Sequence, residues 1–341
     1  MTGLKCTMIT ERITDPTTIE TAEIETILET GRSATIQFSK ADYSPELLAA
    51  VNELCRAFGP RIEVRFFGHY SECFDASIVS YLPNVRWLAI DCLTHVRNED
   101  ALWRLPLLER LSFGVFEFDN PNFLDKAPLE QLTHLSLSEN RKRNFNLASI
   151  GRCGNLCNLF VQGHTKGIST LAKAPQLERV HLSSIPKRQD LSFVNDIQKL
   201  KSLEVLLGGR QTIDEIHHPT LEELRIVRVR GLETLGSLVR FPALRVLHIE
   251  DQLQMREISV LGSQLHELCA LNCKNLEQII GLSELDKLVH FRAYETRLDL
   301  DALVQFDWPS SLEVLALYSG NEKWNKKARQ ELDKRGYREF S

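Results

Sequence analysis

The segment Leu132-Thr133-His134-Leu135-Ser136-Leu137 decides the fold, because its pattern of apolar residues returns along most of the chain. Clear copies lie at 221–226, 244–249 and 312–317. Successive copies are spaced by 18 to 26 residues, and a period of this length predicts a stack of short repeated units. The pattern L-x-x-L-x-L, with other apolar residues allowed, begins at Val85, Leu108, Leu132, Leu156, Leu177, Leu203, Leu221, Leu244, Leu265, Leu288 and Leu312.

Each copy predicts a short β-strand, because its last residues alternate between apolar side chains that point inward and others that point outward. A second apolar group follows the strand, as at 191–194, 232–235 and 279–282. One unit alone cannot bury both apolar rows, so we expect neighbouring units to stack with their strands in parallel.

This repeat resembles the leucine-rich repeat family, in particular the short class of about 22 residues found in bacterial cytosolic repeat proteins, internalins and phosphatase regulatory subunits. The resemblance covers about 83–319. It implies an α/β fold, a horseshoe-shaped leucine-rich repeat solenoid with a concave parallel β-sheet and about eleven repeats.

One departure from the family pattern concerns the asparagine expected three positions after the last strand leucine. It is present at Asn140, and Cys273 takes that place in its own repeat, whereas the remaining repeats carry other residues there. We therefore expect the family's ladder of buried side-chain to backbone hydrogen bonds to be broken.

The two ends are expected to cover the solenoid, because a terminal strand would otherwise expose unpaired backbone groups and an apolar cross-section. Residues 1–82 are predicted to form an α/β cap that continues the solenoid, 83–319 the repeats, and 320–341 a capping helix that Asn321 precedes.

Local signals place the elements of the N-terminal cap. Thr17-x-x-Glu20 predicts a capping box at the start of a helix that ends at Gly31. Ser44-Pro45 predicts the start of a second helix, between strands near 34–38 and 61–67.

The composition favours a cytoplasmic protein with no membrane segment. Hydrophobic residues make up 43% of the chain and charged residues 26%, and no window approaches the uninterrupted apolar length of a membrane helix. Eight cysteines without an apparent export signal predict free thiols in a reducing compartment. The net charge of −5 does not favour binding to nucleic acid through phosphate neutralisation.

Two columns of residues, the third and fifth of each unit, are expected to line the concave surface. In this alignment arginine and histidine fill 8 of the 22 positions, whereas the acids there are Glu223 and Glu267 alone. The bias predicts a binding site for a partner protein with an acidic surface, because guanidinium groups make paired hydrogen bonds to carboxylates. The alternative is that exposed strand positions simply tolerate polar residues. The candidate binding residues are Arg110, His134, Phe160, Arg179, His181, Leu207, Arg225, His248, His290 and Arg292.

No motif predicts catalysis, a cofactor or a metal site. His134 and Ser136 share one expected strand, but no carboxylate is placed to orient the imidazole. Neither Cys153-x3-Cys157 nor Cys269-x3-Cys273 has a common zinc-ligand spacing, and the latter cysteine occupies a buried position of the repeat.

The sequence therefore predicts a non-catalytic module for protein–protein recognition that binds its partner on the concave face. A more specific alternative is an immunity or regulatory protein that neutralises a cognate toxin or effector. A further alternative is an enzyme or a polyanion-binding protein that uses the histidines and arginines of the two columns. Oligomeric state and partner identity are left open.

Overall fold

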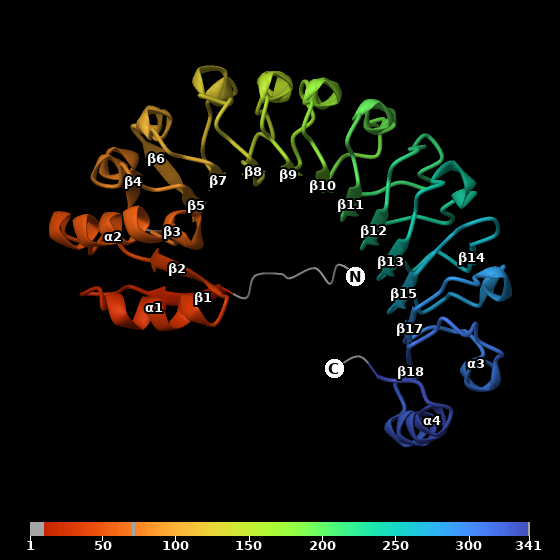
Figure 1. The fold of residues 1–341 in the computed structure, drawn as a ribbon. Coiled ribbons are helices and arrows are strands. Elements are labelled where there is room, and N and C mark those ends of the chain that lie inside the picture. Colours follow the sequence, from red (N-terminus) through yellow and green to blue (C-terminus); the bar gives the residue numbers. More distant parts are fainter. Residues whose placement is uncertain (1–9, 70–71, 340–341) are drawn as a thin grey trace. The chain divides into compact units, whose positions relative to one another are not determined.

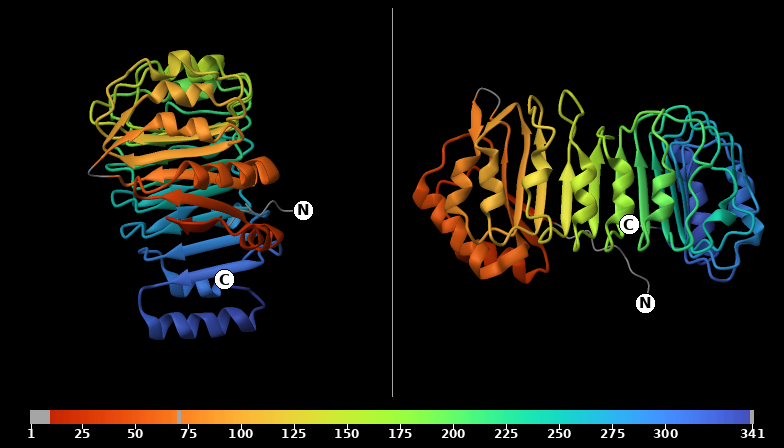
Figure 2. Two further views of the ribbon diagram at one scale, coloured as in Figure 1. Left: turned by 90° about the vertical axis from the view of Figure 1, so that its left-hand side faces the viewer. Right: turned by 90° about the horizontal axis from the view of Figure 1, so that it is seen from above.

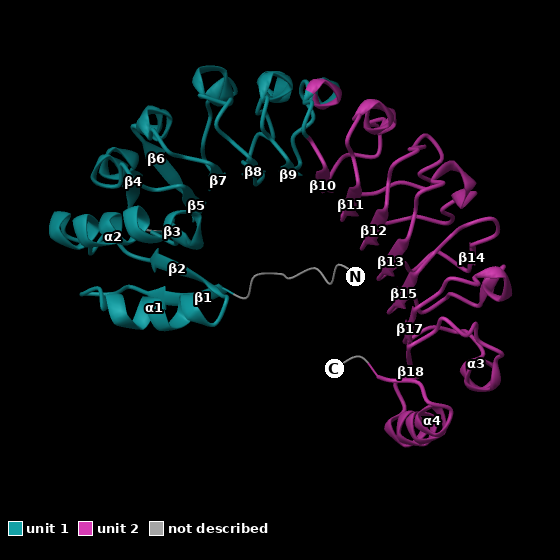
Figure 3. Ribbon diagram, in the orientation of Figure 1, with its two compact units in different colours: residues 1–170, 174–176 teal, residues 171–173, 177–341 magenta. Residues whose placement is uncertain are grey.

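The computed structural model describes residues 10–69 and 72–339. Contacts within the chain divide it into two compact units (Figure 3). Unit 1 comprises residues 1–170 and 174–176, and unit 2 comprises 171–173 and 177–341. We describe each unit by itself.

The main sheet of unit 1 has the strand order β1-β2-β3-β5-β7-β8-β9, and each neighbouring pair is parallel. Its strands are β1 (Thr10–Thr14), β2 (Ser33–Phe38), β3 (Ile62–Phe67), β5 (Trp87–Leu93), β7 (Arg110–Val115), β8 (His134–Leu137) and β9 (Asn158–Gln162). The short strands β4 (Cys73–Asp75) and β6 (His95–Arg97) pair separately. The helices are α1 (Thr21–Glu29), α2 (Pro45–Phe58) and 3-10 turns such as η2 (Ala76–Tyr81), η3 (Glu99–Arg104) and η5 (Leu147–Arg152).

Unit 2 repeats this arrangement with the strand order β10-β11-β12-β13-β15-β17-β18. Its strands are β10 (Arg179–Ser183), β11 (Ser202–Leu206), β12 (Glu223–Val227), β13 (Val246–Glu250), β15 (Glu267–Leu271), β17 (His290–Tyr294) and β18 (Val314–Tyr318), with β14 (Glu257–Ser259) and β16 (Gln278–Ile280) as a separate pair. The helices are η7 (Ser192–Asp196), η8 (Leu238–Arg240), η9 (Leu282–Glu284), α3 (Leu300–Gln305) and α4 (Glu322–Lys334).

Within each unit, the main-sheet strands lie side by side along one side of the stack and the short helices lie on the other (Figures 1 and 2). Apolar side chains fill the space between these two layers. Leu224 and Ile226 of β12 are fully buried, and Val194 of η7 and Leu238 of η8 reach the core from the opposite side. Each such side chain contributes about 1.5–3 kcal/mol by leaving water. The predicted α/β solenoid with a parallel sheet is confirmed.

One repeat is shifted relative to the prediction. The unit predicted to begin at Leu203 begins at Leu200, because Leu203 pairs in register with the core-facing Val180 and Leu224. The two neighbouring spacings become 23 and 21 residues instead of 26 and 18. The two irregular spacings were therefore a consequence of wrong alignment.

A row of buried polar side chains follows the strands in part of the stack. The Asn140 side-chain amide donates to the Phe118 carbonyl (2.9 Å). The next repeat has His164 in the same place, fully buried, with Nε2 3.0 Å from the Ser138 carbonyl. Its Nδ1 accepts a hydrogen bond from the Phe145 amide (3.2 Å). The His164 imidazole thus makes the kind of buried side-chain to backbone hydrogen bond that the family's asparagine makes.

Two repeats of unit 2 carry polar residues in this row as well. Gln252 and Cys273 are buried and donate to the carbonyls of Glu250 (2.8 Å) and Leu271 (3.4 Å). The ladder is interrupted between them and His164, as the sequence predicts, because no polar side chain occupies the three equivalent positions. Ile185 and Val229 are apolar and buried, and the third position is Gly208.

The helices predicted near the two ends are present, with one correction. Ser44 caps α2 and Asn321 caps α4, each accepting a backbone hydrogen bond of 3.2 Å. Helix α1 begins after Glu20, which makes no capping hydrogen bond through its side chain, so the capping box predicted from Thr17 and Glu20 is not formed. Strand β1 and helix α3 were not predicted.

His164 makes the stability of unit 1 depend on pH. Burial lowers the pKa of His164, so the unfolded chain binds the proton more readily than the folded chain. Its contribution to stability is therefore complete above the unfolded pKa of about 6.5 and is lost as the pH falls below that value.

We expect His164→Asn to reduce the fall in melting temperature between about pH 7.5 and 5.5. The asparagine side chain supplies an N–H donor for the Ser138 carbonyl in place of the imidazole N–H, and it does not titrate in this range. Thermal unfolding followed by circular dichroism measures this. His95→Asn, which changes an exposed histidine, is the control and should leave the pH profile unchanged. Equal profiles for wild type and His164→Asn would contradict the assignment.

Candidate functional site

The outward-facing side chains of the unit 2 strands form what we call the sheet face of unit 2. Strand pairing places them in two straight rows, because each residue lies beside its equivalent in the next strand. The third-position row is Arg179, Ser202, Glu223, Val246, Glu267, His290 and Val314. The fifth-position row is His181, Glu204, Arg225, His248, Cys269, Arg292 and Ala316.

The ten candidate residues are divided between the two units. Three of them, Arg110, His134 and Phe160, lie on strands of unit 1. Six lie in the two rows of unit 2, namely Arg179, His181, Arg225, His248, His290 and Arg292. Leu207 lies in neither row, as the shifted repeat requires.

The corrected register changes the charge of the columns. Leu207 follows the end of β11, and Val205 is buried in the core, so the positions assigned to them belong to Ser202 and Glu204. The two columns then hold four arginines and three glutamates, and the remaining basic side chains are histidines. The excess of positive charge that the sequence predicts therefore rests largely on histidine protonation.

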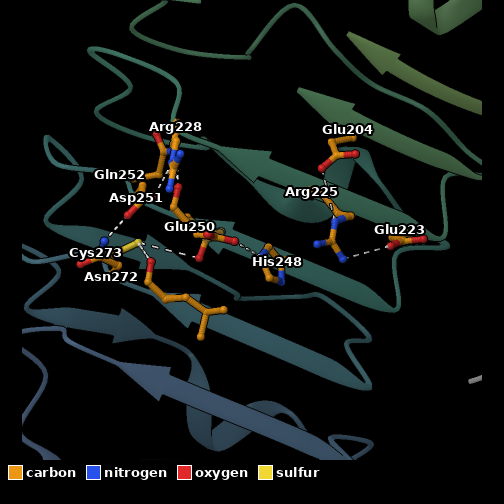
Figure 4. A network of polar contacts seen from close by, with 12 residues as sticks. Glu204, Glu223, Arg225, Arg228, His248, Glu250, Asp251, Gln252, Asn272 and Cys273 are labelled. Atoms are coloured by element: carbon orange, nitrogen blue, oxygen red, sulfur yellow. Dashed lines mark hydrogen bonds and ion pairs between the residues drawn. The ribbon is translucent and has the colours of Figure 1, made fainter. Parts of the chain in front are cut away.

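A network of charged side chains that we call the Glu204 network occupies the middle of this face (Figure 4). The Glu204 carboxylate lies 2.5 Å from Nδ1 of His181 on β10 and 3.6 Å from Nε of Arg225 on β12. Arg225 also reaches Glu223 (3.8 Å), which accepts a hydrogen bond from the Ser202 hydroxyl (3.1 Å). The side chains come from adjacent, hydrogen-bonded strands about 4.8 Å apart. The sheet backbone therefore fixes the positions from which they contact one another.

The other two histidines of the face also contact carboxylates. Nε2 of His248 lies 3.1 Å from Glu250, and Nδ1 of His290 lies 3.4 Å from Glu267. Burial lowers the pKa of His248 and outweighs the opposing effect of Glu250, so its imidazole is neutral at neutral pH. His248 therefore contributes a neutral hydrogen-bonding group to this face.

The candidate residues of unit 1 have different surroundings. The Arg110 guanidinium lies over the ring of Trp87, 5.1 Å from its centroid. The two ring nitrogens of His134 lie 2.9 Å from the Thr133 hydroxyl and 2.6 Å from the Asn158 amide. Both ring nitrogens of the imidazole therefore lie within hydrogen-bonding distance of neighbouring polar side chains.

The cysteines singled out by their spacing are buried or half-buried. Burial raises the pKa of Cys153 to about 12 and that of Cys273 to about 11, so both remain protonated thiols at neutral pH. Within residues 10–69 and 72–339, no group of three or more histidine, cysteine or acidic side chains is placed to hold a metal ion.

The repeats of both units share one geometry. Each repeat contributes one strand in parallel register, places its second and third pattern leucines in the core, and returns through a short helix or turn on the other side. The chain has the leucine-rich repeat fold.

Several solved structures are similar to this fold, whereas the sequence comparisons find no relative. Neither a protein-family model nor a curated protein matches the sequence. Among solved structures, an internalin from Listeria monocytogenes is 16% identical with a TM-score of 0.41, over 84% of this chain and 74% of that one. A leucine-rich repeat protein from Leptospira interrogans is 14% identical with a TM-score of 0.37, over 89% and 88% of the two chains.

A chain of the Toll–Spätzle complex from Drosophila is 14% identical with a TM-score of 0.49, over 91% of this leucine-rich repeat chain. The match covers 50% of that longer chain. At these identities the likeness concerns the fold alone. Among the described residues, every helix is too short or too polar to cross a lipid bilayer.

Arg225 should stabilise the folded state through the two glutamates that it contacts. We expect Arg225→Met to lower the free energy of unfolding by about 1 kcal/mol, because the guanidinium is partly exposed and screened by water. In a Glu204→Gln, Glu223→Gln background the same change should cost less, since the carboxylates are gone. Urea unfolding of the four proteins measures the coupling, and an equal cost in both backgrounds would contradict it.

Proposed function

We propose that this chain is a non-catalytic protein-recognition module that binds a partner protein on the sheet face of unit 2. The observation that carries the proposal is the Glu204 network, which presents donors and acceptors on adjacent strands of a rigid sheet. Binding groups that are already fixed lose little conformational freedom on association, so such a surface favours specific binding.

The charge balance of this face indicates the kind of partner surface. Glu204 and Glu223 lie between Arg179 at one end of the rows and Arg292 toward the other. A partner with both acidic and basic groups would match this pattern better than a uniformly acidic surface. Complementary charges of this kind contribute to specificity and association rate more than to affinity.

Two further parts of the proposal concern chemistry and compartment. The buried thiols of Cys153 and Cys273 and the contacts of His134 support a binding role rather than catalysis by these groups. We also propose the cytosol as the compartment, because the chain carries eight cysteines and the seven that the structure describes are free thiols.

The first experiment is affinity capture from the native host with mass spectrometry, using wild type and an Arg225→Glu variant. We expect a specific protein to be captured by wild type. Its recovery should fall at least about tenfold with the variant, because an acidic side chain at position 225 would repel an acidic group of the partner that Arg225 contacts. Arg256→Glu, beside the separate strand pair β14–β16, is the matched control and should retain the partner.

A charge-swapped variant, Glu204→Arg with Arg225→Glu, separates binding from folding. It keeps one acid and one base side by side. Adding His181→Gln and Glu223→Gln removes the like-charge contacts that the swapped groups would otherwise make with these two neighbours, so thermal unfolding should stay close to that of wild type while partner recovery falls. Full recovery with both variants, together with cross-links to residues outside the sheet face, would show that the partner binds elsewhere.

A further inference from the structure

A row of mostly apolar side chains runs beside the Glu204 network, at the ends of the unit 2 strands. Strand pairing places Leu206, Val227, Glu250, Leu271, Tyr294 and Tyr318 next to one another in that order. Leu207 follows directly after Leu206. We call the apolar members of this row, together with Leu207, the strand-end strip.

The strip exposes apolar surface that the fold does not require. Leu207 and Tyr294 each retain 39% of their surface exposed, and the rings of Tyr294 and Tyr318 pack edge to face with centroids 6.0 Å apart. The equivalent positions of unit 1 carry small or polar residues in most strands. Four of these are Asp91, Gly114, Ser138 and Gln162.

Leu207 is disfavoured for two independent reasons. Its φ of +57° lies in the left-handed region, where a leucine side chain is strained and glycine or asparagine is preferred. Its side chain is also exposed, so burial does not offset the strain. Other repeats of unit 2 place Ser184, Arg228, Asp251 and Asn272 at the equivalent turn. A strained and exposed leucine points to a role outside the fold.

The row contains one acid, at its centre. Glu250 lies between Val227 and Leu271, and its carboxylate contacts the imidazole of His248 (3.1 Å). Because burial keeps His248 neutral, this contact does not cancel the charge of Glu250 at neutral pH. The neighbouring Asp251 differs, since Arg228 neutralises it at 2.6 Å. The strip thus offers apolar surface on both sides of one negative charge.

We propose that the strand-end strip docks an amphipathic helix of the partner protein, with apolar residues on one side and a lysine or arginine placed over Glu250. The proposal rests on the proposed function and names a second contact region for the same partner. Successive strip residues are about 4.8 Å apart, close to the helix pitch of about 5.4 Å, so one apolar side chain per helical turn meets one strand. A tyrosine pair beside an apolar row is the composition of a binding hot spot.

The probe is a fluorescein-labelled helical peptide of leucine and lysine about 18 residues long, a length that spans the strip. Fluorescence anisotropy measures its binding to the full chain. We expect a Leu207→Asn, Tyr294→Ser variant to weaken binding at least about tenfold, which is the loss of roughly one buried apolar contact of 1.4 kcal/mol. Glu250→Gln should weaken binding of this peptide as well. A leucine–glutamate peptide of the same length should bind more weakly than the lysine peptide.

The control variant is Val239→Asn, which changes an apolar residue that is 61% exposed and lies on the helical side of the stack. It should bind the peptide as wild type does. Equal binding by wild type and the strip variant, or equal binding of the lysine and glutamate peptides, would overturn the proposal.

Thermal unfolding separates a binding role of Leu207 from a structural one. Leu207→Asn should raise the melting temperature, because asparagine adopts positive φ more readily than leucine. A lower melting temperature would mean that Leu207 supports the fold, and the proposal would fail.

Partner capture distinguishes this inference from the proposed function. Loss of the partner with the Glu204 network variants but not with Leu207→Asn, Tyr294→Ser would overturn the strip and leave the sheet face as the binding site. Loss with the strip variant alone would support the strip and overturn the role of the Glu204 network.

Discussion

Backbone hydrogen bonds between successive parallel strands hold every repeat in register with the next, and the rest of each unit depends on this pairing. Because side chains alternate along a strand, the register decides at once which residues enter the core and which line the open face. A shift changes both sets together. The apolar rows on either side of the strands are buried only because neighbouring repeats share them.

The sequence was sufficient for the fold and most strand positions, because the spacing of buried leucines follows directly from the geometry of the repeat. The prediction was wrong at one repeat, where Leu200, Leu203 and Leu206 are each three residues apart and two alignments match the first two leucines of the pattern. Only the alignment that begins at Leu200 has an apolar residue, Val205, at the sixth position, because the other has Gly208 there. Leu207 has a positive φ and lies in the turn that ends the strand. A leucine does not predict a turn with positive φ, because glycine and asparagine are the residues usually found there. The even spacing of 23 and 21 residues also favours the alignment from Leu200, and the strand pairing confirms it.

The composition of the open face was harder to predict than its position. Counting arginines and histidines treated each side chain as an independent charge, whereas neighbouring strands bring Glu204 to His181 and Arg225. The burial of His248 could not be inferred from one strand, since it depends on the residues of the strands on both sides. Likewise, His164 and Gln252 replace the asparagine of the repeat with different side chains that reach backbone groups, which a search for asparagine alone misses.

The buried thiols offer a separate reporter for each unit. Cys153 lies in unit 1 and Cys273 in unit 2, and both are fully shielded from solvent in the folded state. An alkylating reagent can reach either sulfur only when the surrounding repeats open, so the rate of modification at each site measures local opening rather than intrinsic thiol reactivity. Mass spectrometry of the two modified peptides could therefore tell whether the units open together or one before the other, without adding a probe to the chain.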